Sequence, residues 1–85
     1  MKTKNKIDLS KMQQIYSSGD WKFEQENDGT YTVHHALLNG SLGRVYLDNL
    51  NHCVEVSFNL GVGLTCNDIH IIEVLLREMN ANLEA

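Results

Sequence analysis

The sequence predicts a two-layer α+β sandwich: a four-stranded antiparallel meander with an N-terminal and a C-terminal helix on one face, in the order α-β-β-β-β-α. Two features indicate this fold class. Four short segments alternate apolar and polar residues and are separated by Gly, Asn and Asp turns, which is typical of strands with one buried face. The two end segments instead repeat apolar residues at helical spacing and would cover that face.

Residues 9–18 are predicted to form the first helix. Its apolar residues recur at helical spacing, at Leu9, Met12, Ile15 and Tyr16. Ser10 and Gln13 fit a capping box at its start, with Asp8 as an alternative cap. Gly19 is suited to end the helix in a left-handed conformation.

The first two strands are predicted over residues 21–26 and 30–37. In the first strand, Trp21 and Phe23 share one face. In the second, the inner face is assigned to Tyr31, Val33, His35 and Leu37. The tripeptide Asn27-Asp28-Gly29 between them supplies residues that tolerate positive φ, so it predicts a hairpin turn.

The third strand, residues 44–48, conflicts with the simplest turn before it. A two-residue turn at Asn39-Gly40 would place Tyr46 on the inner face, whereas the alternation assigns that face to Val45. One extra residue resolves the conflict. We therefore expect either a bulge near Gly43 or a longer irregular loop from Asn39 to Gly43.

The fourth strand, residues 53–60, is the most regular of the four. Its apolar face is assigned to Val54, Val56, Phe58 and Leu60. After Gly61-Val62-Gly63, the pair Thr65 and Asp68 forms a capping-box pattern that begins a long amphipathic helix. One arc of that helix holds Ile69, Ile71, Ile72, Leu75, Leu76, Met79 and Leu83. Val74 falls outside this arc.

The second face of the predicted sheet carries polar side chains and stays open. We nominate it as a protein-interaction surface made of Glu24, Thr32, His34, Arg44, Tyr46, Cys53, Glu55 and Ser57. The edge strands of a plain meander would be residues 21–26 and 53–60. The second of these is apolar, with only Glu55 to guard it, so it invites pairing with another chain unless a helix or the N-terminal arm shields it.

Charge is distributed unevenly along the 85 residues. The first eleven residues carry +3 and the remainder carries −7. We expect residues 1–7 to be a flexible Lys-rich arm and residues 8–85 to form one domain. The acidic body argues against direct nucleic-acid binding. There is no apolar run of membrane-spanning length and no signal-peptide core, which favours a cytoplasmic protein with reduced thiols at Cys53 and Cys66.

The histidines and cysteines of the chain do not form a pattern that indicates a metal site or a catalytic site. The relevant set is His34, His35, His52, Cys53, Cys66 and His70. Its spacings match no zinc knuckle, and His34 and His35 point to opposite faces of a strand. Cys66 and His70 are adjacent on one helix but have no evident pocket. Gly61-Val62-Gly63 lacks the remaining residues of a phosphate-binding loop. We therefore expect no catalytic site, no cofactor and no metal.

A resemblance of architecture adds to this interpretation. The stretch from Val45 to Met79 resembles the strand–turn–strand–helix half of small acidic dimeric chaperones of the type III secretion kind, although the helix that those chaperones insert between strands is missing. In size and acidity the chain is also similar to small inhibitor proteins of phages and plasmids. Neither resemblance implies a role for any individual residue.

The sequence therefore predicts a small acidic, non-enzymatic protein-binding module of the adaptor, chaperone or inhibitor type. A phage or another mobile element is one source that this hypothesis allows. It would act through the open sheet face or an edge strand, as a homodimer, on a partner with a basic surface. The alternative is a small Cys- and His-dependent metal-binding or thiol-redox protein.

Overall fold

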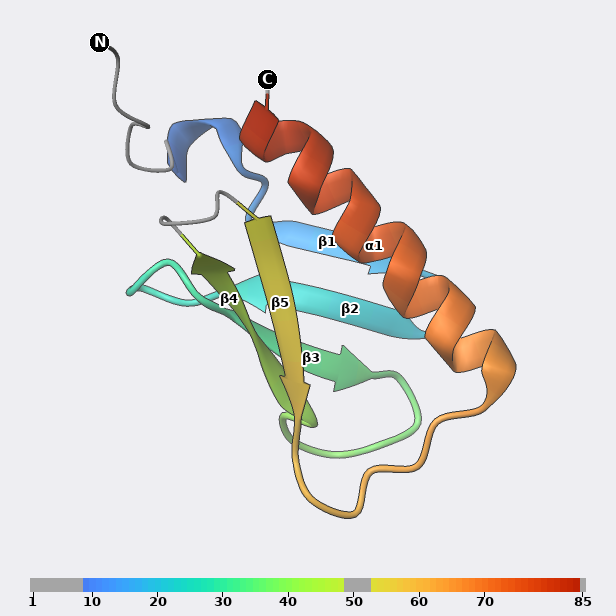
Figure 1. Cartoon of the computed structure of the whole chain (residues 1–85). Coiled ribbons are helices and arrows are strands. Elements are labelled where there is room, and N and C mark those ends of the chain that lie inside the picture. The colour runs from blue at the N-terminus through green and yellow to red at the C-terminus, as the bar shows by residue number, and fades with distance from the viewer. Residues whose placement is uncertain (1–8, 49–52, 85) are drawn as a thin grey trace, which may run out of the picture.

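The computed structural model describes residues 9–48 and 53–84, which form a five-stranded antiparallel sheet and one long C-terminal helix (Figure 1). In chain order the elements are the 3-10 turn η1 (Leu9–Lys11), β1 (Ile15–Ser18), β2 (Trp21–Gln25), β3 (Tyr31–His35), β4 (Gly43–Asp48), β5 (Cys53–Phe58) and α1 (Cys66–Glu84). The strand order β1-β2-β3-β4-β5 is a meander. The α+β class and the antiparallel sheet are confirmed. The predicted arm, residues 1–7, lies outside the described residues.

The prediction of a helix over residues 9–18 is wrong. A single 3-10 turn forms at Leu9–Lys11, and Ile15–Ser18 is a fifth strand whose register pairs Tyr16 with Phe23. The spacing of Met12 and Tyr16 fits either structure. Within β1, however, the β-branched Ile15 and the aromatic Tyr16 favour a strand, and the two serines disfavour a helix. Gly19, at φ 58°, turns the chain from β1 into β2.

One helix, and not the predicted two, covers the apolar face of the sheet. The sheet curls so that α1 packs against both of its edge strands, β1 and β5 (Figure 1). In that view β1 and β2 cross β4 and β5 obliquely, and α1 lies along the opening between the two ends of the sheet. Strongly twisted antiparallel sheets take this shape, and here it lets a single helix close the core.

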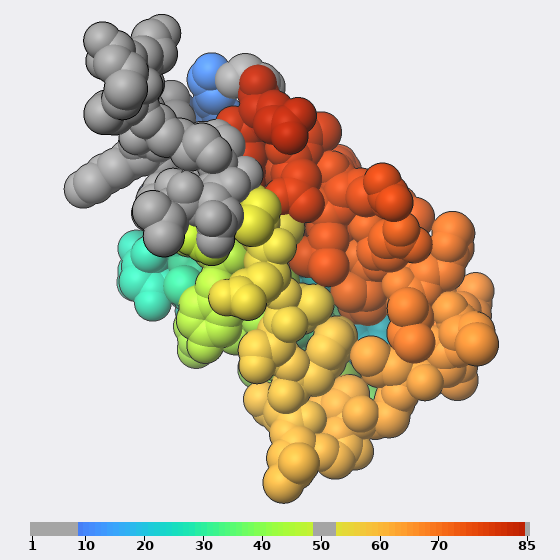
Figure 2. Space-filling view, viewed as in Figure 1, coloured from blue at the N-terminus to red at the C-terminus, as the bar shows by residue number. Residues whose placement is uncertain are grey.

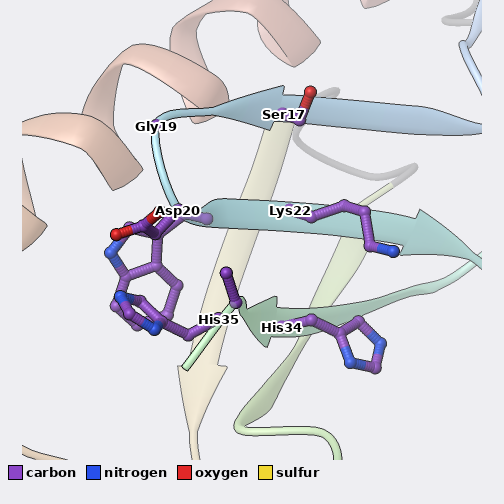
Figure 3. A pocket seen from close by; sticks show the side chains of 8 residues that line it. Ser17, Gly19, Asp20, Lys22, His34 and His35 are labelled. Atoms are coloured by element: carbon purple, nitrogen blue, oxygen red, sulfur yellow. The ribbon is translucent and has the colours of Figure 1, made fainter. Parts of the chain in front are cut away.

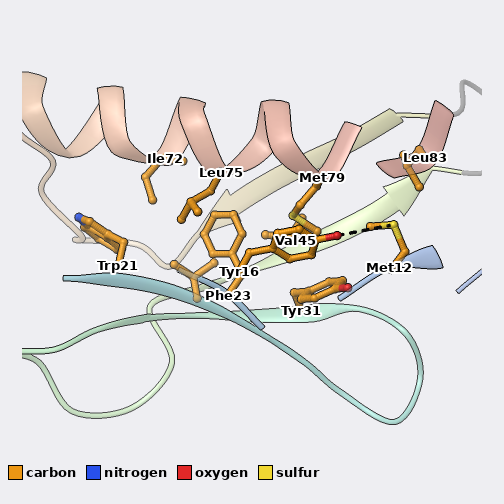
Figure 4. Packing of buried hydrophobic residues seen from close by; sticks show 11 residues of the cluster. Met12, Tyr16, Trp21, Phe23, Tyr31, Val45, Ile72, Leu75, Met79 and Leu83 are labelled. Carbon is orange, nitrogen blue, oxygen red and sulfur yellow. Dashed lines mark hydrogen bonds between the residues drawn. The ribbon is translucent and has the colours of Figure 1, made fainter. Parts of the chain in front are cut away.

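The core lies between the concave face of the sheet and α1 (Figure 4). Its buried side chains are Met12, Tyr16, Trp21, Phe23, Tyr31, Val33, Val45, Ile72, Leu75, Met79 and Leu83. The predicted inner face of the strands is therefore confirmed at most positions. It is wrong for Leu37 and Leu60, which are 80% and 106% exposed because they lie beyond the ends of β3 and β5. Ile69, assigned to the apolar arc of the helix, is also exposed.

Two buried tyrosines fasten the segment before β1 to the core. The Tyr31 hydroxyl donates to the backbone carbonyl of Gln13, and the Tyr16 hydroxyl accepts from the Gln13 N–H at 3.1 Å and from the side-chain amide of Asn82. The two rings meet edge to face at 5.7 Å. Burial, and secondly the neighbouring Tyr16, raises the pKa of Tyr31 well above its usual range. Both phenols thus act as hydrogen-bonding core residues.

Of the two alternatives for the connection between β3 and β4, the longer irregular loop is present, but it spans residues 36–42 and not Asn39 to Gly43, because β3 ends at His35 and Gly43 begins β4. Val33 pairs with Gly43 and Tyr31 with Val45, so both valines share the inner face. Residues 36–42 connect the strands, and Leu42 N–H donates to the Val33 carbonyl at 2.7 Å. The extra residues remove the conflict in register that a two-residue turn would create.

The predicted capping box at the start of α1 is confirmed. Thr65 N–H donates to Asp68 Oδ2 at 2.9 Å, and Asp68 N–H donates to Thr65 Oγ1 at 3.1 Å. The other carboxylate oxygen of Asp68 accepts from the Trp21 indole at 3.1 Å, which ties the helix to β2. The bonds from the Thr65 N–H and then from Trp21 lower the pKa of Asp68 from its ordinary value.

The first prediction concerns acid stability. The pKa of Asp68 is lower in the folded state, so its stabilising effect is complete above the ordinary aspartate range and is lost as the pH falls through the folded pKa. We expect Asp68→Asn to be less stable than the wild type at neutral pH and to approach it under strongly acidic conditions. Urea denaturation over a pH series measures the difference. A gap that is independent of pH would contradict this role of the carboxylate.

Candidate protein-interaction surfaces

The register of the sheet brings all eight nominated residues onto its convex side, which we call the outer face: Glu24, Thr32, His34, Arg44, Tyr46, Cys53, Glu55 and Ser57. Residues that are direct partners across strands project to the same side. Glu24, Thr32, Arg44 and Ser57 therefore form one row across four strands, and Tyr46 pairs with Glu55. Alternation within strands is enough to assign these residues to one face.

A hydrogen-bonded group on β2 and β3 centres on Thr32, which is almost fully buried. Its Oγ1 lies 2.9 Å from Glu26 Oε2 and 2.8 Å from His34 Nε2. Because a hydroxyl has one hydrogen, donation to the Glu26 carboxylate leaves Thr32 to accept from Nε2 of His34. Glu24 Oε1 lies 3.8 Å from the same imidazole nitrogen and would form an ion pair with the protonated ring.

A second group orients Arg44 on β4. Its guanidinium donates to Thr30 Oγ1 at 2.9 Å, and that hydroxyl donates to Asp28 Oδ1 at 2.7 Å. The Thr30 N–H donates to the same carboxylate oxygen at 2.9 Å. The side-chain bond from Thr30, then its backbone bond, lowers the pKa of Asp28, and the nearby Arg44 charge acts in the same direction. These hydrogen bonds therefore give Arg44 a defined orientation in the folded protein.

The rest of the outer face is more accessible. Tyr46 is 43% exposed, Glu55 and Ser57 are exposed, and Cys53 is half-buried at the start of β5. Carboxylates outnumber cations on this side of the sheet: Glu24, Glu26, Asp48 and Glu55 stand against Lys22 and Arg44. The outer face therefore presents an aromatic ring and an oriented guanidinium in an acidic surround.

The edges of the sheet differ in part from the prediction. β2 is an internal strand, because β1 pairs with it, so residues 21–26 do not form an edge. β5 is an edge strand, as predicted. Its Val54 N–H donates to Asn80 Oδ1 on α1 at 3.0 Å. The helix thus shields one end of this edge. The sequence leaves open whether the edge is free to pair with another chain or is shielded, and the structure shows a partly shielded edge.

A hollow of about 320 Å³ lies where β2 begins and β3 ends (Figure 3). The Trp21 and His35 rings meet edge to face at 4.8 Å, and His35 Nδ1 accepts the Leu37 N–H at 3.1 Å. Lys22 and His34 extend along the outer face, away from this ring pair. His34 and His35 thus lie on opposite sides of β3, as the alternation predicts.

Sequence reasoning missed an apolar surface at the end of the molecule formed by residues 36–42 and 59–64, which we call the loop end. The two segments are joined by hydrogen bonds from Asn59, whose N–H donates to the Leu42 carbonyl at 2.8 Å and whose side-chain amide donates to the Ser41 carbonyl at 2.9 Å. Leu37, Leu38 and Leu60 are exposed there. The available signal was the uncharged sequence of both segments, ALLNGSL and NLGVGL.

The cysteines and histidines are dispersed over the part of the chain that the structure describes. Cys53 lies on the outer face, whereas Cys66 is exposed at the first position of α1. His70 is exposed one turn further along the helix. Within residues 9–48 and 53–84, no three His, Cys, Asp or Glu side chains are grouped as a metal site would require. His52 lies outside these ranges.

Comparisons with known proteins do not assign the chain to a family. No family model matches it, and searches of curated proteins and of solved structures likewise find no match. Over the described residues, α1 is too polar to qualify as a membrane-crossing helix, and no other helix is long enough.

Proposed function

We propose that the chain is a non-enzymatic protein-binding module, of the adaptor, chaperone or inhibitor type, that docks a partner protein on its outer face. The observation that supports this most directly is that two residues suited to binding lie on the same side of β4. Arg44 is oriented by Thr30, and Tyr46, two residues further along the strand, has an exposed ring. Tyrosine and arginine are the residue types most enriched among interface residues of high energetic weight.

Pre-orientation makes this pair better suited to binding than an ordinary exposed arginine. A free arginine loses much side-chain entropy when a partner immobilises it. Here the hydrogen bond to Thr30, itself bonded to Asp28, restrains Arg44 in the unbound protein. The Tyr46 ring adds a rigid apolar contact with a polar tip.

The charge of the outer face favours a partner with a basic surface. Glu24, Asp48 and Glu55 leave this side of the sheet with more negative than positive groups. Opposite charges on two proteins accelerate their encounter and disfavour acidic competitors. We infer that the partner presents lysines or arginines opposite these carboxylates, and an acceptor for Arg44 beside the patch that accommodates Tyr46.

The second prediction tests the outer face. The double variant Arg44→Ala/Tyr46→Ala should bind the partner at least about tenfold more weakly, since interface tyrosines and arginines often contribute more than ~1 kcal/mol each. The partner is first captured from the native host with the wild-type protein. Affinities of the purified pair are then measured by calorimetry at low and high salt, where acidic–basic pairing predicts weaker binding at high salt.

The matched control removes an arginine from elsewhere. Glu73→Ala/Arg77→Ala deletes an exposed ion pair of 2.8 Å on α1 and should leave binding unchanged. Circular dichroism verifies that both variants fold. Equal affinity of the outer-face variant and the wild type would refute docking on this face.

A further inference from the structure

The loop end carries apolar side chains that the fold does not use. Leu37, Leu38 and Leu60 are 80%, 55% and 106% exposed, although hydrogen bonds from Asn59 hold the two segments together. The β5–α1 connection projects as the tip at the bottom of Figure 2. Burial of such side chains is favourable, and clustered exposed leucines on a small domain indicate a contact surface.

A hollow lies beside these projecting leucines. Its volume is about 470 Å³, within the ~300–1,000 Å³ range of pockets that hold sizeable groups. The lining is Trp21, His35, Leu37, Leu38, Leu42, Gly61, Val62, Gly63 and Asp68. A projection, Leu60, therefore directly precedes residues 61–63 of a hollow whose lining is apolar except for His35 and Asp68. A twofold axis makes such a surface self-complementary, because the projection of each copy can enter the hollow of the other.

The distribution of charge favours a second copy of the chain as the occupant. The loop end, residues 36–42 and 59–64, contains no charged side chain, whereas the rest of the described chain holds ten Asp and Glu against four Lys and Arg. Asp68, the one acidic residue in the lining of the hollow, already accepts hydrogen bonds from the Trp21 indole and the Thr65 N–H. Two copies would repel each other through any acidic surface. The loop end is a neutral surface on which they can meet, whereas a basic partner would be attracted to the acidic surfaces instead.

We propose that the chain forms a twofold-symmetric homodimer through the loop end, with Leu60 of each copy inserted into the hollow of the other. Leu37 and Leu38 pack around that contact. Trp21, the only tryptophan in the chain, forms part of the hollow. The contact uses none of the eight outer-face residues, so it goes beyond the proposed docking of a partner and can fail independently of it.

The test is sedimentation of the full chain over about 1 to 300 μM, with Trp21 emission followed on dilution. A concentration-dependent dimer is expected, and Leu37→Ser/Leu60→Ser should raise its dissociation constant at least tenfold without loss of helical signal. Val74→Ser, which alters an apolar residue of α1 that is 43% exposed and lies outside the loop end, should leave it unchanged. Added salt screens the acidic bodies and should tighten the dimer.

Two results would overturn the assignment. One is a wild-type chain that stays monomeric at the highest concentration. The other is a dimer that persists in Leu37→Ser/Leu60→Ser, which would transfer the interface to the β5 edge. The Leu variants keep Arg44 and Tyr46, so capture of a partner by a monomeric Leu variant would separate failure of the dimer from failure of the proposed function.

Discussion

Gly43→Ala should destabilise the protein by about 3 kcal/mol, the upper part of the range for added atoms in a packed interior. A Cβ at this position would lie 2.5 Å from the Ser57 carbonyl oxygen and 2.9 Å from the Phe58 Cα, both backbone atoms of β5. No rotamer change relieves such a contact, so β4 and β5 must move apart where they pair. At ~4–8 °C per kcal/mol for a domain of this size, the melting temperature should fall by roughly 12–24 °C.

Gly63→Ala provides the matched control. Neither glycine has a positive φ, and an added Cβ at position 63 meets no atom within 4 Å. The control substitution should therefore be neutral or slightly stabilising, because alanine reduces the entropy of the unfolded chain. Thermal and urea denaturation measure the stability of both variants. The difference between them gives the effect of the close backbone contact at position 43, without the general effect of replacing a glycine. Similar stabilities of the two would show that β4 and β5 do not approach this closely.

Local alternation was sufficient to predict the inner and outer faces of the strands. Trp21, Phe23 and Val45 are buried as expected, because period-two patterning depends only on neighbouring residues. Leu37 and Leu60 continue the same alternation, yet both lie past the ends of their strands. A strand ends where the neighbouring strand stops pairing with it. The neighbouring strand can lie far away in the sequence, so the end of a strand cannot be read from the residues of that strand alone.

For the candidate surfaces, too, features that depend on neighbouring residues could be predicted, and features that depend on distant residues could not. The members of the outer face could be named from alternation alone, but the hydrogen bonds that orient Arg44 depend on Thr30 and Asp28, which belong to another strand and its turn. The loop end could not be predicted, because it requires the β3–β4 and β5–α1 connections to meet. Asn59 joins them through contacts with residues 41 and 42, seventeen or more positions earlier in the chain.

Tyr16→Ala should be among the most damaging substitutions in the molecule, and it tests the strand that the sequence failed to predict. The side chain is 1% exposed, packs against Tyr31, and holds Gln13 and Asn82 through its hydroxyl. Truncation of a buried aromatic residue costs about 3–5 kcal/mol. A domain of this length has a total stability of only about 4–13 kcal/mol, so the substitution should remove between roughly a quarter and all of it.

The neighbouring Ile15 distinguishes a strand from a helix. In β1 it points away from the core and is 47% exposed, so Ile15→Ala should cost less than about 1 kcal/mol. In the helix that the apolar spacing suggested, both residues would face the core and both substitutions would be severe. Tyr16→Phe keeps the ring and loses the hydroxyl bonds, so its expected cost of about 1 kcal/mol remains measurable if the alanine variant does not fold. Comparable damage from Ile15→Ala and Tyr16→Ala in urea denaturation would mean that β1 is not a strand and that α1 packs against a different surface.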